Sequence, residues 1–283
     1  MSNFIAVTGA SGFVGRYFIE EMGTKVRPIS RTKLCHQNSV VVESIDSNTD
    51  WEYALADCTS VIHLAALAHT EPSGEFLLEE VNVRGTIRLF EESISRGVER
   101  FIYVSTIGIH GTASFDTPFT PFDSEKPNGA YAESKLLAET ELKKIASSSD
   151  IELVIIRPPL IYGKDAPGNF LSLINFMSTF PILPFGLARN SRDFISIYNF
   201  VDFLKYCLGA DDVLGKIILP TDNDTMSIRE FTTKLALCLG KKVYQFPVPV
   251  FLIKWVAKAI GKERVFQQLF GNLEVDYEAN NIS

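Results

Sequence analysis

Tyr131 and Lys135 are the residues whose types and spacing point most directly to chemistry, and both belong to the segment YAESK that opens a predicted helix. Residues four apart share one face of a helix, so both side chains can reach the same site. A tyrosine has a pKa of about 10 and is a weak base at neutral pH, but a nearby ammonium group favours its phenolate. The pair therefore predicts an acid/base site, with a surface Tyr/Lys pair on an amphipathic helix as the alternative.

A hydroxyl group that could face this pair belongs to Thr106, which follows the predicted strand Arg100–Ser105. The carboxyl ends of parallel strands line the edge of a sheet where ligands bind. Thr106 is therefore expected either to hydrogen-bond a ligand or only to cap the end of its strand. A polar loop rich in glycine, proline and threonine, Gly108–Gly129, separates it from Tyr131.

A second feature with chemical meaning is the glycine-rich stretch TGASGFVG at Thr8–Gly15. The apolar run Phe4–Val7 precedes it and an apolar helical pattern follows, so the expected order is strand, turn and helix. Glycines suit a turn in which the backbone approaches a pyrophosphate and the helix offers free N–H groups. The G-x-x-G-x-x-G spacing differs from the usual G-x-G-x-x-G. It predicts dinucleotide binding, although a purely structural turn could use the same glycines.

The choice of dinucleotide depends on Arg31. Ser30 and Arg31 stand about 20 residues beyond the glycines, where an NAD site usually carries an acidic residue. An arginine at that place suits the 2′-phosphate of NADP. NADP(H) is therefore the favoured cofactor and NAD(H) the alternative, while a solvated loop charge is the structural explanation of Arg31.

Apolar strand and helix patterns alternate along the first part of the chain. The strand expected over Ser60–Ala66 is nearly continuously apolar, as in a parallel sheet covered on both faces, and its His63 is expected to be a satisfied core histidine. Right-handed crossovers then favour a Rossmann-type doubly wound parallel sheet with helices on both faces. The other elements are expected at Lys25–Ser30 and Ser39–Ile45 (strands), Trp51–Ala56 (a short helix) and Glu75–Ser95 (a longer helix).

The composition is that of an ordinary soluble enzyme, with 46% hydrophobic and 22% charged residues among 283. The net charge of −7 leaves no basic surface for nucleic acid. The cysteines are scattered without metal-ligand spacing, which predicts neither a metal site nor a disulfide framework and fits a reducing cytoplasm. No signal peptide is apparent at the N-terminus.

The most membrane-like stretch is Val248–Ile260, which is too short to span a bilayer. Lys254 and Lys258 share one helical face, so an amphipathic packing helix is expected, with a membrane-surface or dimer helix as the alternative. No insertion into a membrane is predicted.

Several ordered motifs together resemble the extended short-chain dehydrogenase/reductases that modify nucleotide sugars. They are TGASGFVG at Thr8, HLAA at His63, VNVRGT at Val81, VST ending at Thr106, YAESK at Tyr131 and RPPLIYG at Arg157. The resemblance extends over essentially the whole chain. It is greatest to the branch that contains nucleotide-sugar 4-epimerases and bacterial C4-reductases of 4-keto-6-deoxy-N-acetylhexosamines.

The resemblance implies a role for each member of the site. Tyr131 is the expected acid/base, Lys135 is expected to bind the nicotinamide ribose and lower the tyrosine pKa, and Thr106 is expected to hydrogen-bond the sugar C4 oxygen. Asn82 resembles the helix asparagine that supports this site. The residues expected to hold the cofactor are Gly9, Ser11, Gly12, Phe13, Val14, Gly15, Arg31, Ser44, Ile45, Leu64, Ala65, Ala66, Tyr131, Lys135 and Pro158.

The C-terminal part resembles the substrate lobe of this family, so residues 1–165 are expected to form the dinucleotide domain and residues 166–283 mainly a smaller α/β substrate lobe. Asn169 opens an apolar helix there and is an expected substrate contact. Arg192 suits the diphosphate of a nucleotide sugar, because a guanidinium group can bind it in a bidentate manner. A structural salt bridge with Asp193 or a neighbouring residue is the alternative.

The resemblance also implies partners. A UDP-sugar is the expected substrate, and a homodimer is expected to form through the helices after Glu75 and Ala130 in a four-helix arrangement. Relatives continue beyond a segment like Leu273–Asp276, whereas this chain ends at Ser283. A truncated chain, or the lack of a final helix over the substrate, is therefore expected.

Departures from the family's patterns guide the choice of reaction. Relatives that are 4,6-dehydratases carry Asp-Glu after the active-site threonine, whereas Ile107-Gly108 stands here, so that reaction is disfavoured. Arg31, and Leu160 at the place of a substrate-binding asparagine in many epimerases, favour a C4-reductase over a 4-epimerase with tightly held NAD. A non-catalytic NADP(H) sensor is disfavoured, because Thr106, Tyr131 and Lys135 are all kept. At Ser44, relatives often place an aspartate that touches adenine, and here the Ile45 backbone could still contribute.

Overall fold

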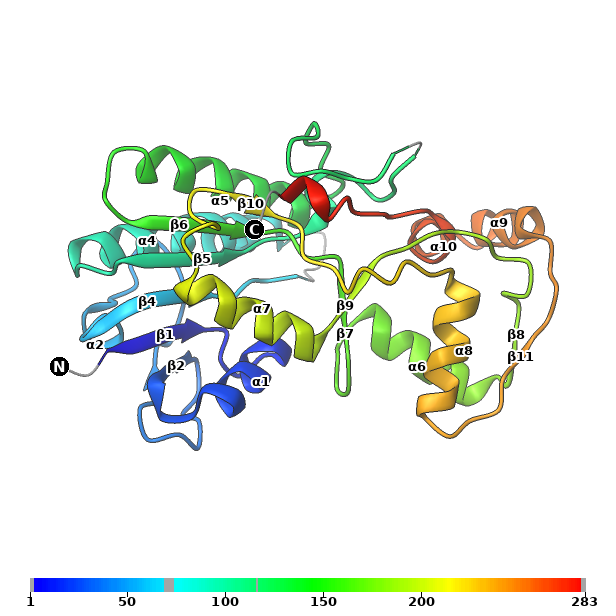
Figure 1. The fold of residues 1–283 in the computed structure, drawn as a ribbon, viewed down its shortest axis with the longest axis horizontal. Coiled ribbons are helices and arrows are strands. Elements are labelled where there is room, and N and C mark those ends of the chain that lie inside the picture. Colours follow the sequence, from blue (N-terminus) through cyan, green and yellow to red (C-terminus); the bar gives the residue numbers. More distant parts are fainter. Residues whose placement is uncertain (1–2, 69–73, 116, 281–283) are drawn as a thin grey trace.

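The computed structural model describes residues 3–68, 74–115 and 117–280. Its main feature is a seven-stranded parallel sheet with the order β3-β2-β1-β4-β5-β6-β10 (Figure 1). This order is that of the doubly wound dinucleotide fold, extended by one strand, and it confirms the predicted fold class. The strands are β1 (Phe4–Thr8), β2 (Val26–Ser30), β3 (Val40–Val41), β4 (Cys58–His63), β5 (Arg100–Val104), β6 (Glu152–Ile156) and β10 (Ile217–Ile218).

Helices cover both faces of the sheet because neighbouring residues on each strand point to opposite sides. On β1, Ala6 packs into one apolar cluster and Val7 into the other. The first cluster lies under α2 (Glu52–Leu55), α4 (Gly85–Ser95) and α5 (Ala130–Ala146). The second lies under α1 (Phe13–Met22) and α7 (Ile197–Gly209), which appear on the opposite side of the sheet in Figure 1.

The expected helix over Glu75–Ser95 is continuous but not uniform. It begins as α3 (Glu75–Leu78), widens into the π-helix η3 (Glu79–Arg84) and continues as α4. A π-helix inside an α-helix is uncommon and often marks a functional site. Here it contains Asn82, one of the predicted site residues.

The third strand is shorter than predicted, with only Val40–Val41 of the expected Ser39–Ile45 in β3. After Val42 the chain leaves the sheet and packs against α4. A Cβ atom added to Gly85 would lie 2.9 Å from the Asp46 backbone nitrogen, so the missing side chain permits this close contact. The β-branched sequence pattern could not reveal this tertiary contact.

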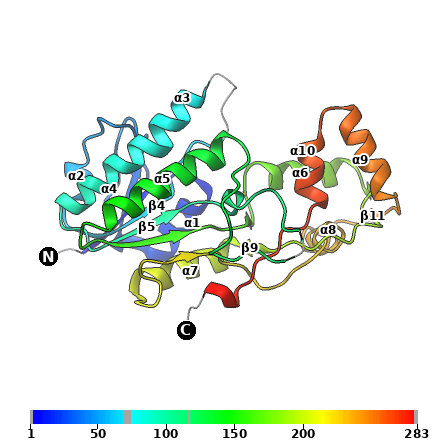
Figure 2. The same ribbon diagram turned by 90° about the horizontal axis from the view of Figure 1, so that it is seen from above.

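A smaller lobe extends beyond the carboxyl edge of the sheet (Figures 1 and 2). Its own apolar core contains Phe170, Phe194 and Phe231. The chain enters this lobe after β7 (Leu160–Tyr162) and leaves it through β9 (Phe194–Ser196). These two strands pair with each other. The lobe's other elements are α6 (Asn169–Thr179), β8 (Ile182–Leu183), α8 (Ile228–Cys238), β11 (Tyr244–Gln245), α9 (Val250–Ala259) and α10 (Glu263–Phe270).

The chain crosses between the two regions more than once. After β9 it returns to the sheet, where α7 packs on α1 and β10 pairs with β6. The division at residue 165 therefore remains a proposal about function, because part of the later segment completes the dinucleotide fold. Within the described residues, no helix has the length and apolar character needed to cross a membrane.

Candidate active site

The glycine turn lies at the carboxyl end of β1, beside β2 and the residues after β4. Gly9 has a φ of +68°, and a Cβ atom there would lie 2.8 Å from the Ala65 nitrogen. The Ala10 N–H donates to the Ile29 carbonyl at 3.3 Å, which fixes the turn to β2. Gly9 therefore needs to be glycine for its backbone angle and for the close approach of Leu64 and Ala65.

The start of α1 has the donor groups that a pyrophosphate requires. Gly12 precedes the helix without any side-chain cap, and the first turn has no acidic residue. The N–H groups of this turn are therefore left for an anion, with the favourable helix dipole behind them. Ser11 and Gly12 are exposed, while Phe13 and Val14 are half-buried and Gly15 is buried. These residues fit the anionic diphosphate of a dinucleotide.

Arg31 follows the carboxyl end of β2, at the same edge of the sheet as the glycine turn after β1. Its side chain is exposed and has no hydrogen bond or ion pair with any residue in the described part of the chain. Ser44, in contrast, is exposed but donates its hydroxyl to the Asp46 carboxylate. The guanidinium group of Arg31 is thus available to a ligand. The Ser44 hydroxyl is bonded to Asp46, which leaves the Ile45 backbone as the expected contact to adenine.

His63 is a core histidine, as predicted. Its Nδ1 lies 2.6 Å from the Thr8 hydroxyl and its Nε2 lies 2.8 Å from the Thr86 hydroxyl. Burial lowers the pKa of His63 to about 3, so the ring is neutral at physiological pH. The histidine therefore joins β1, β4 and α4 behind the expected cofactor residues Leu64 to Ala66 and has no free nitrogen for catalysis.

Thr106 follows β5 and caps the short helix η4 (Ile107–Ile109). Its Oγ1 accepts a hydrogen bond from the Gly108 N–H at 3.1 Å. The capping role is therefore present, and the hydroxyl hydrogen is still able to donate to a ligand. The Ile107 N–H donates to the Pro158 carbonyl at 3.0 Å, so the residue expected to touch the cofactor supports this turn through its backbone.

Tyr131 and Lys135 lie on α5 next to the end of β5. The Lys135 Nζ lies over the Tyr103 ring, 4.0 Å from its centre, in a cation–π contact. Burial lowers the pKa of Lys135 to about 7, although the charge of Glu139 opposes this shift. Burial also raises the pKa of Tyr131 to about 12. The protein alone therefore does not produce the lowered tyrosine pKa that was expected.

Asn82 joins the π-helix to both neighbouring parts of the site. Its side-chain oxygen accepts from the Leu67 N–H at 2.8 Å, and its amide donates to the Leu67 carbonyl and to the Ser134 hydroxyl, each at 3.0 Å. Ser134 in turn donates to the Tyr131 carbonyl at 2.8 Å. Asn82 is therefore a positioning residue that holds the loop after β4 against the start of α5.

A buried ion network behind α5 was not predicted from the sequence. The Arg157 Nε donates to the two Glu139 oxygens at 3.0 and 3.2 Å, and its other nitrogens contact Glu125 at 2.6 Å and His110 at 2.8 Å. Arg157 and Glu139 are both fully buried. The helical period could have revealed Glu139, because it lies four residues after Lys135 on the same face of α5.

Arg192 in the lobe is the guanidinium group that was predicted to bind a diphosphate. Arg192 is largely buried and donates to the Gly271 carbonyl at 2.7 Å, and no carboxylate among the described residues pairs with it. Burial lowers its pKa to about 10. The alternative of an Asp193 salt bridge is wrong, because the Asp193 carboxylate accepts from Thr225 and from the Val275 N–H.

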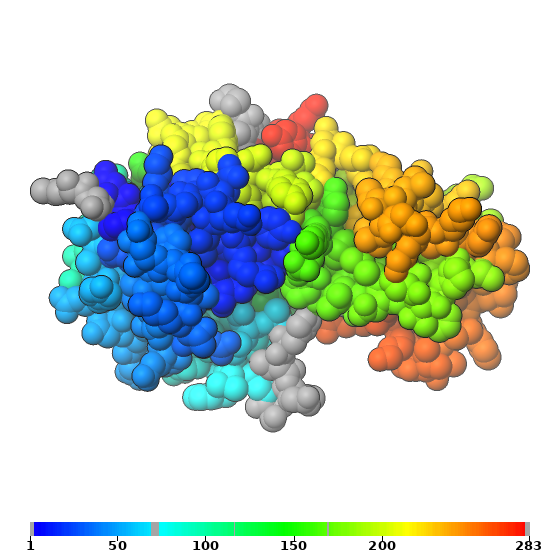
Figure 3. All heavy atoms as spheres, turned by 90° about the horizontal axis from the view of Figure 1, so that it is seen from below, coloured from blue at the N-terminus to red at the C-terminus, as the bar shows by residue number. Residues whose placement is uncertain are grey.

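Arg264 on α10 is a second guanidinium that sequence reasoning missed. Its nitrogens lie 3.6 and 3.9 Å from the position of a Cβ atom on Gly129, which directly precedes α5. Arg264 has no ion pair within the described residues and is exposed beside Tyr131's helix. Asn169 begins α6 in the lobe, as predicted. The space-filling view shows the blue and cyan N-terminal segments beside the green and orange segments of the lobe (Figure 3).

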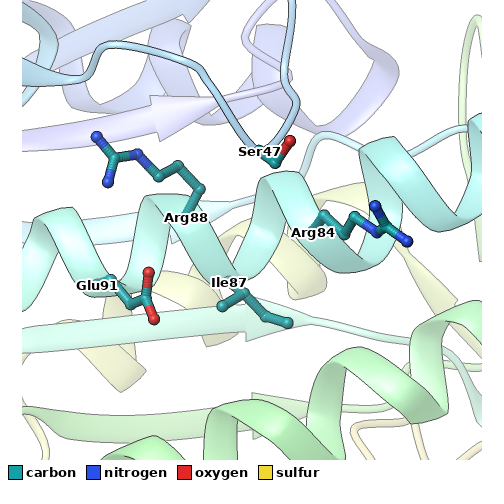
Figure 4. A pocket seen from close by; sticks show the side chains of 5 residues that line it. All are labelled: Ser47, Arg84, Ile87, Arg88 and Glu91. Carbon is teal, nitrogen blue, oxygen red and sulfur yellow. The ribbon is translucent and has the colours of Figure 1, made fainter.

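A separate hollow lies on the outer side of α4 and has a volume of about 250 Å³. It is lined by Ser47, Arg84, Ile87, Arg88 and Glu91, and Figure 4 shows Arg84 and Arg88 pointing in different directions along the helix. Arg84 pairs with Glu79 and Arg88 with Glu92, so their charges have partners. None of the predicted site residues lines this hollow. Among the described residues, no cluster of histidine, cysteine and carboxylate side chains could hold a metal ion.

Comparisons with known proteins give relatives over nearly the whole chain. The chain is 34% identical over 288 residues to UDP-glucose 4-epimerase from Vibrio cholerae, which covers 98% of this chain and 88% of the relative. It is 26% identical over 261 residues to N-acetyl-alpha-D-glucosaminyl-diphospho-ditrans,octacis-undecaprenol 4-epimerase from Escherichia coli O157:H7, covering 88% and 76%. The first of these relatives meets the sequence-based expectation of nucleotide-sugar chemistry.

The fold has close counterparts among solved structures. UDP-N-acetylglucosamine 4-epimerase from Methanobrevibacter ruminantium M1, in complex with UDP-N-acetylmuramic acid, superposes with a TM-score of 0.74 at 18% identity over 99% of this chain and 92% of that one. The family model for the NAD dependent epimerase/dehydratase family matches residues 5–218. With this match and the 34% identity of the Vibrio enzyme, the chain belongs to the NAD dependent epimerase/dehydratase family of enzymes.

Proposed function

We propose that this protein is a 4-epimerase that oxidises and re-reduces C4 of a hexose carried on a nucleotide diphosphate. The observation that carries the proposal is the arrangement at one edge of the sheet. Thr106 follows β5 and caps η4, Lys135 on α5 lies against Tyr103 of β5, and Tyr131 precedes Lys135 by four residues on the same helix, while the uncapped start of α1 follows β1. This arrangement supports a site in which hydroxyl, phenol and amine groups would act beside a bound dinucleotide.

We call the region of Thr106, Tyr131 and Lys135 after β5 the corner, and each of these three side chains has a task in the proposed reaction. Tyr131 removes the proton of the C4 hydroxyl and later returns it, and Thr106 donates a hydrogen bond to the same oxygen. A bound nicotinamide supplies the hydride acceptor and donor and brings a positive charge in its oxidised form. Because burial raises the pKa of Tyr131 to about 12, that charge and protonated Lys135 are needed to stabilise the phenolate. Asn82 keeps the first turn of α5 in place through Ser134.

The epimerase is preferred over a C4-reductase because of the 34% identity to UDP-glucose 4-epimerase. This finding outweighs the sequence-based preference for a reductase of a UDP-4-keto-6-deoxy-N-acetylhexosamine, which depended on Arg31 and Leu160. The reductase remains a second candidate. It is supported by Arg31, whose exposed and unpaired guanidinium could bind the 2′-phosphate of NADP(H).

The substrate is proposed to lie between the sheet edge and the lobe formed mainly by residues 166–283. Arg192 and Arg264 have no carboxylate partner among the described residues, and two guanidinium groups suit a diphosphate. Both named relatives act on a hexose attached to a diphosphate, and one of them is a UDP-sugar enzyme. A UDP-hexose is therefore the first substrate to test, with Asn169 as a further proposed contact.

A homodimer through α3–α4 and α5 is also proposed. Phe76 and Leu77 on α3 and Leu137 on α5 are large apolar residues that the single chain leaves exposed. Pairing these helices with those of a second copy would bury them in a four-helix arrangement. Size-exclusion chromatography with light scattering tests this, and Leu137→Glu should yield a monomer.

The experiment for the reaction starts with purified protein and no added dinucleotide. UDP-glucose and UDP-N-acetylglucosamine are each supplied, the 4-epimers are separated by chromatography, and nucleotide released on denaturation is identified by mass. The 4-epimer together with co-purified NAD is the expected result. Consumption of NADPH by UDP-4-keto-6-deoxy-N-acetylglucosamine, with no epimer formed, would instead establish the reductase. Tyr131→Phe is the control that must lose either activity.

A further inference from the structure

Helix α9 presents large apolar side chains to solvent at the end of the lobe, opposite the N-terminal end of the molecule (Figure 1). Phe251 is 69% and Trp255 70% exposed, and Leu252 and Val256 are also exposed. Ala257 is the helix residue that is buried. An amphipathic packing helix was expected, but the structure turns most of its apolar surface outward. A surface of this kind usually marks a docking site.

The charged residues of α9 and of the segment that leads into it are all lysines, and the first acidic residue after them is Glu263 at the start of α10. The segment 240–262 contains Lys241, Lys242, Lys254, Lys258 and Lys262 and no aspartate or glutamate, although the whole chain carries a net charge of −7. Lys254 and Lys258 are exposed and have no ion pair among the described residues. On the helical wheel they border the exposed apolar side, between it and the residues that face the lobe.

We propose that α9 docks the lobe on the surface of an anionic lipid bilayer. A helix lying in the membrane interface has this combination of aromatic and aliphatic residues on one side with lysines at its edge. Trp255 and Phe251 suit the boundary between headgroups and acyl chains, and lysine stems can extend their ammonium groups toward lipid phosphates. The contact is a shallow one, because α9 is too short to cross a bilayer.

Charge complementarity selects lipid over a second copy of the chain. Pairing α9 with α9 of another copy would bring two lysine-rich edges together without acidic partners, which costs free energy. Anionic lipid headgroups supply the missing negative charge and attract lysines near the surface. Because α10 packs against α9 and carries Arg264 beside Gly129, a docked α9 would hold the start of α5, and with it the proposed active site, on the same part of the molecule as the bilayer contact.

Vesicle flotation tests the proposal with phosphatidylcholine vesicles and with vesicles that also contain phosphatidylglycerol. The protein should float with the anionic vesicles, and high salt should release it. Its tryptophan emission should shift to shorter wavelength on binding, and the shift reports on Trp255 because Trp51 is already fully buried. No flotation with anionic vesicles would overturn the proposal.

Variants assign the binding to α9. Trp255→Glu and the double variant Lys254→Glu/Lys258→Glu should each weaken vesicle binding by about tenfold or more. Tyr53→Glu is the matched control, because Tyr53 is 77% exposed but belongs to α2 on the sheet domain, and it should bind normally. Unchanged binding of both α9 variants would contradict the proposal. A blue shift that depends on protein concentration without lipid would show self-association through α9 and would also overturn it.

The readout is independent of the reaction. The proposed epimerisation of a water-soluble UDP-hexose should be equal in wild type and Trp255→Glu without vesicles, which also shows that the variant is folded. Loss of vesicle binding with full turnover thus supports docking, whereas failure of the proposed function would leave the vesicle result unaffected.

Discussion

The glycine turn after β1 and the corner after β5 lie at the same edge of one sheet but are built in opposite ways. The turn works through missing side chains, with an uncapped helix start and Gly9 in contact with Leu64 and Ala65. The corner works through side chains that are buried and connected, from Asn82 and Ser134 to Lys135 on Tyr103. The turn offers backbone donors, whereas the corner would control protons in the proposed reaction.

This difference shows which substitutions each region tolerates. At the turn, any added atom meets backbone that cannot move aside. At the corner, a substitution that removes a charge or a hydroxyl group should matter more than one that changes side-chain volume, because buried polar groups need their partners.

The largest effect is expected from Tyr131→Phe, which keeps the ring but removes the proton carrier. Turnover should fall by about 10²–10⁴-fold with little change in dinucleotide affinity. Tyr103→Phe is the matched control, because the buried Tyr103 hydroxyl has no partner among the described residues and the ring under Lys135 is kept. Steady-state kinetics of both variants measures this. Equal losses in the two would show that Tyr131 has no special role.

Glu139→Gln should destabilise the fold strongly. It removes the fully buried one of the two carboxylates that pair with the buried Arg157 and leaves only the half-buried Glu125, at a cost of up to about 3–5 kcal/mol in the free energy of unfolding. Urea unfolding followed by circular dichroism measures the change. Arg84→Gln, which breaks only the exposed pairs with Glu79 and Glu80, serves as the comparison and should have little effect. A similar stability for the two variants would mean that the network behind α5 is not a structural support.

Gly9→Ala should weaken dinucleotide binding by about tenfold or more, because it adds backbone strain of about 1–2 kcal/mol and a collision with Ala65. Gly23→Ala separates the two causes. Gly23 has a φ of +56° but has open space around the added atom, so this variant should lose stability and keep dinucleotide affinity. Isothermal titration with NAD and NADP provides the measurement. Normal affinity in folded Gly9→Ala would contradict the cradle.

The smallest effect concerns the pH dependence of stability. The folded pKa of Lys135 is about 7, below its unfolded value of about 10.4. Between these values the unfolded chain binds more protons, so the stability of the wild type should rise with pH relative to Lys135→Met from about pH 7 to pH 9. Denaturant unfolding without cofactor measures the difference. The exposed Lys143→Met should run parallel to wild type, and a parallel Lys135→Met curve would contradict the burial effect.

The parts that could be predicted from sequence are those that depend on local pattern. The alternation of strands and helices predicts the doubly wound sheet, and the apolar neighbours of His63 predict a neutral core histidine. The third strand and the π-helix around Asn82 could not be predicted in detail. Both depend on contacts across the fold, such as the packing of Asp46 against Gly85.

The site shows the same limit. Tyr131 and Lys135 could be placed together because they are neighbours on one helix, and Thr106 because it ends a strand. The helical period could have placed Glu139 near the site, but it could not show that Glu139 pairs with Arg157. That pairing, the pairing of Arg157 with Glu125 and the approach of Arg264 to Gly129 join residues far apart in the chain. The outward orientation of α9 likewise depends on how the lobe packs, since Ala257, and not Trp255, faces inward.

The most direct test of the central claim is conversion of UDP-[4-²H]glucose by purified protein without added dinucleotide, followed by NMR of the product. We expect UDP-galactose that retains deuterium at C4, because the hydride is removed and returned within one site, and we expect no product from Tyr131→Phe. Product that has lost its deuterium to solvent, or undiminished conversion by Tyr131→Phe, would contradict the account.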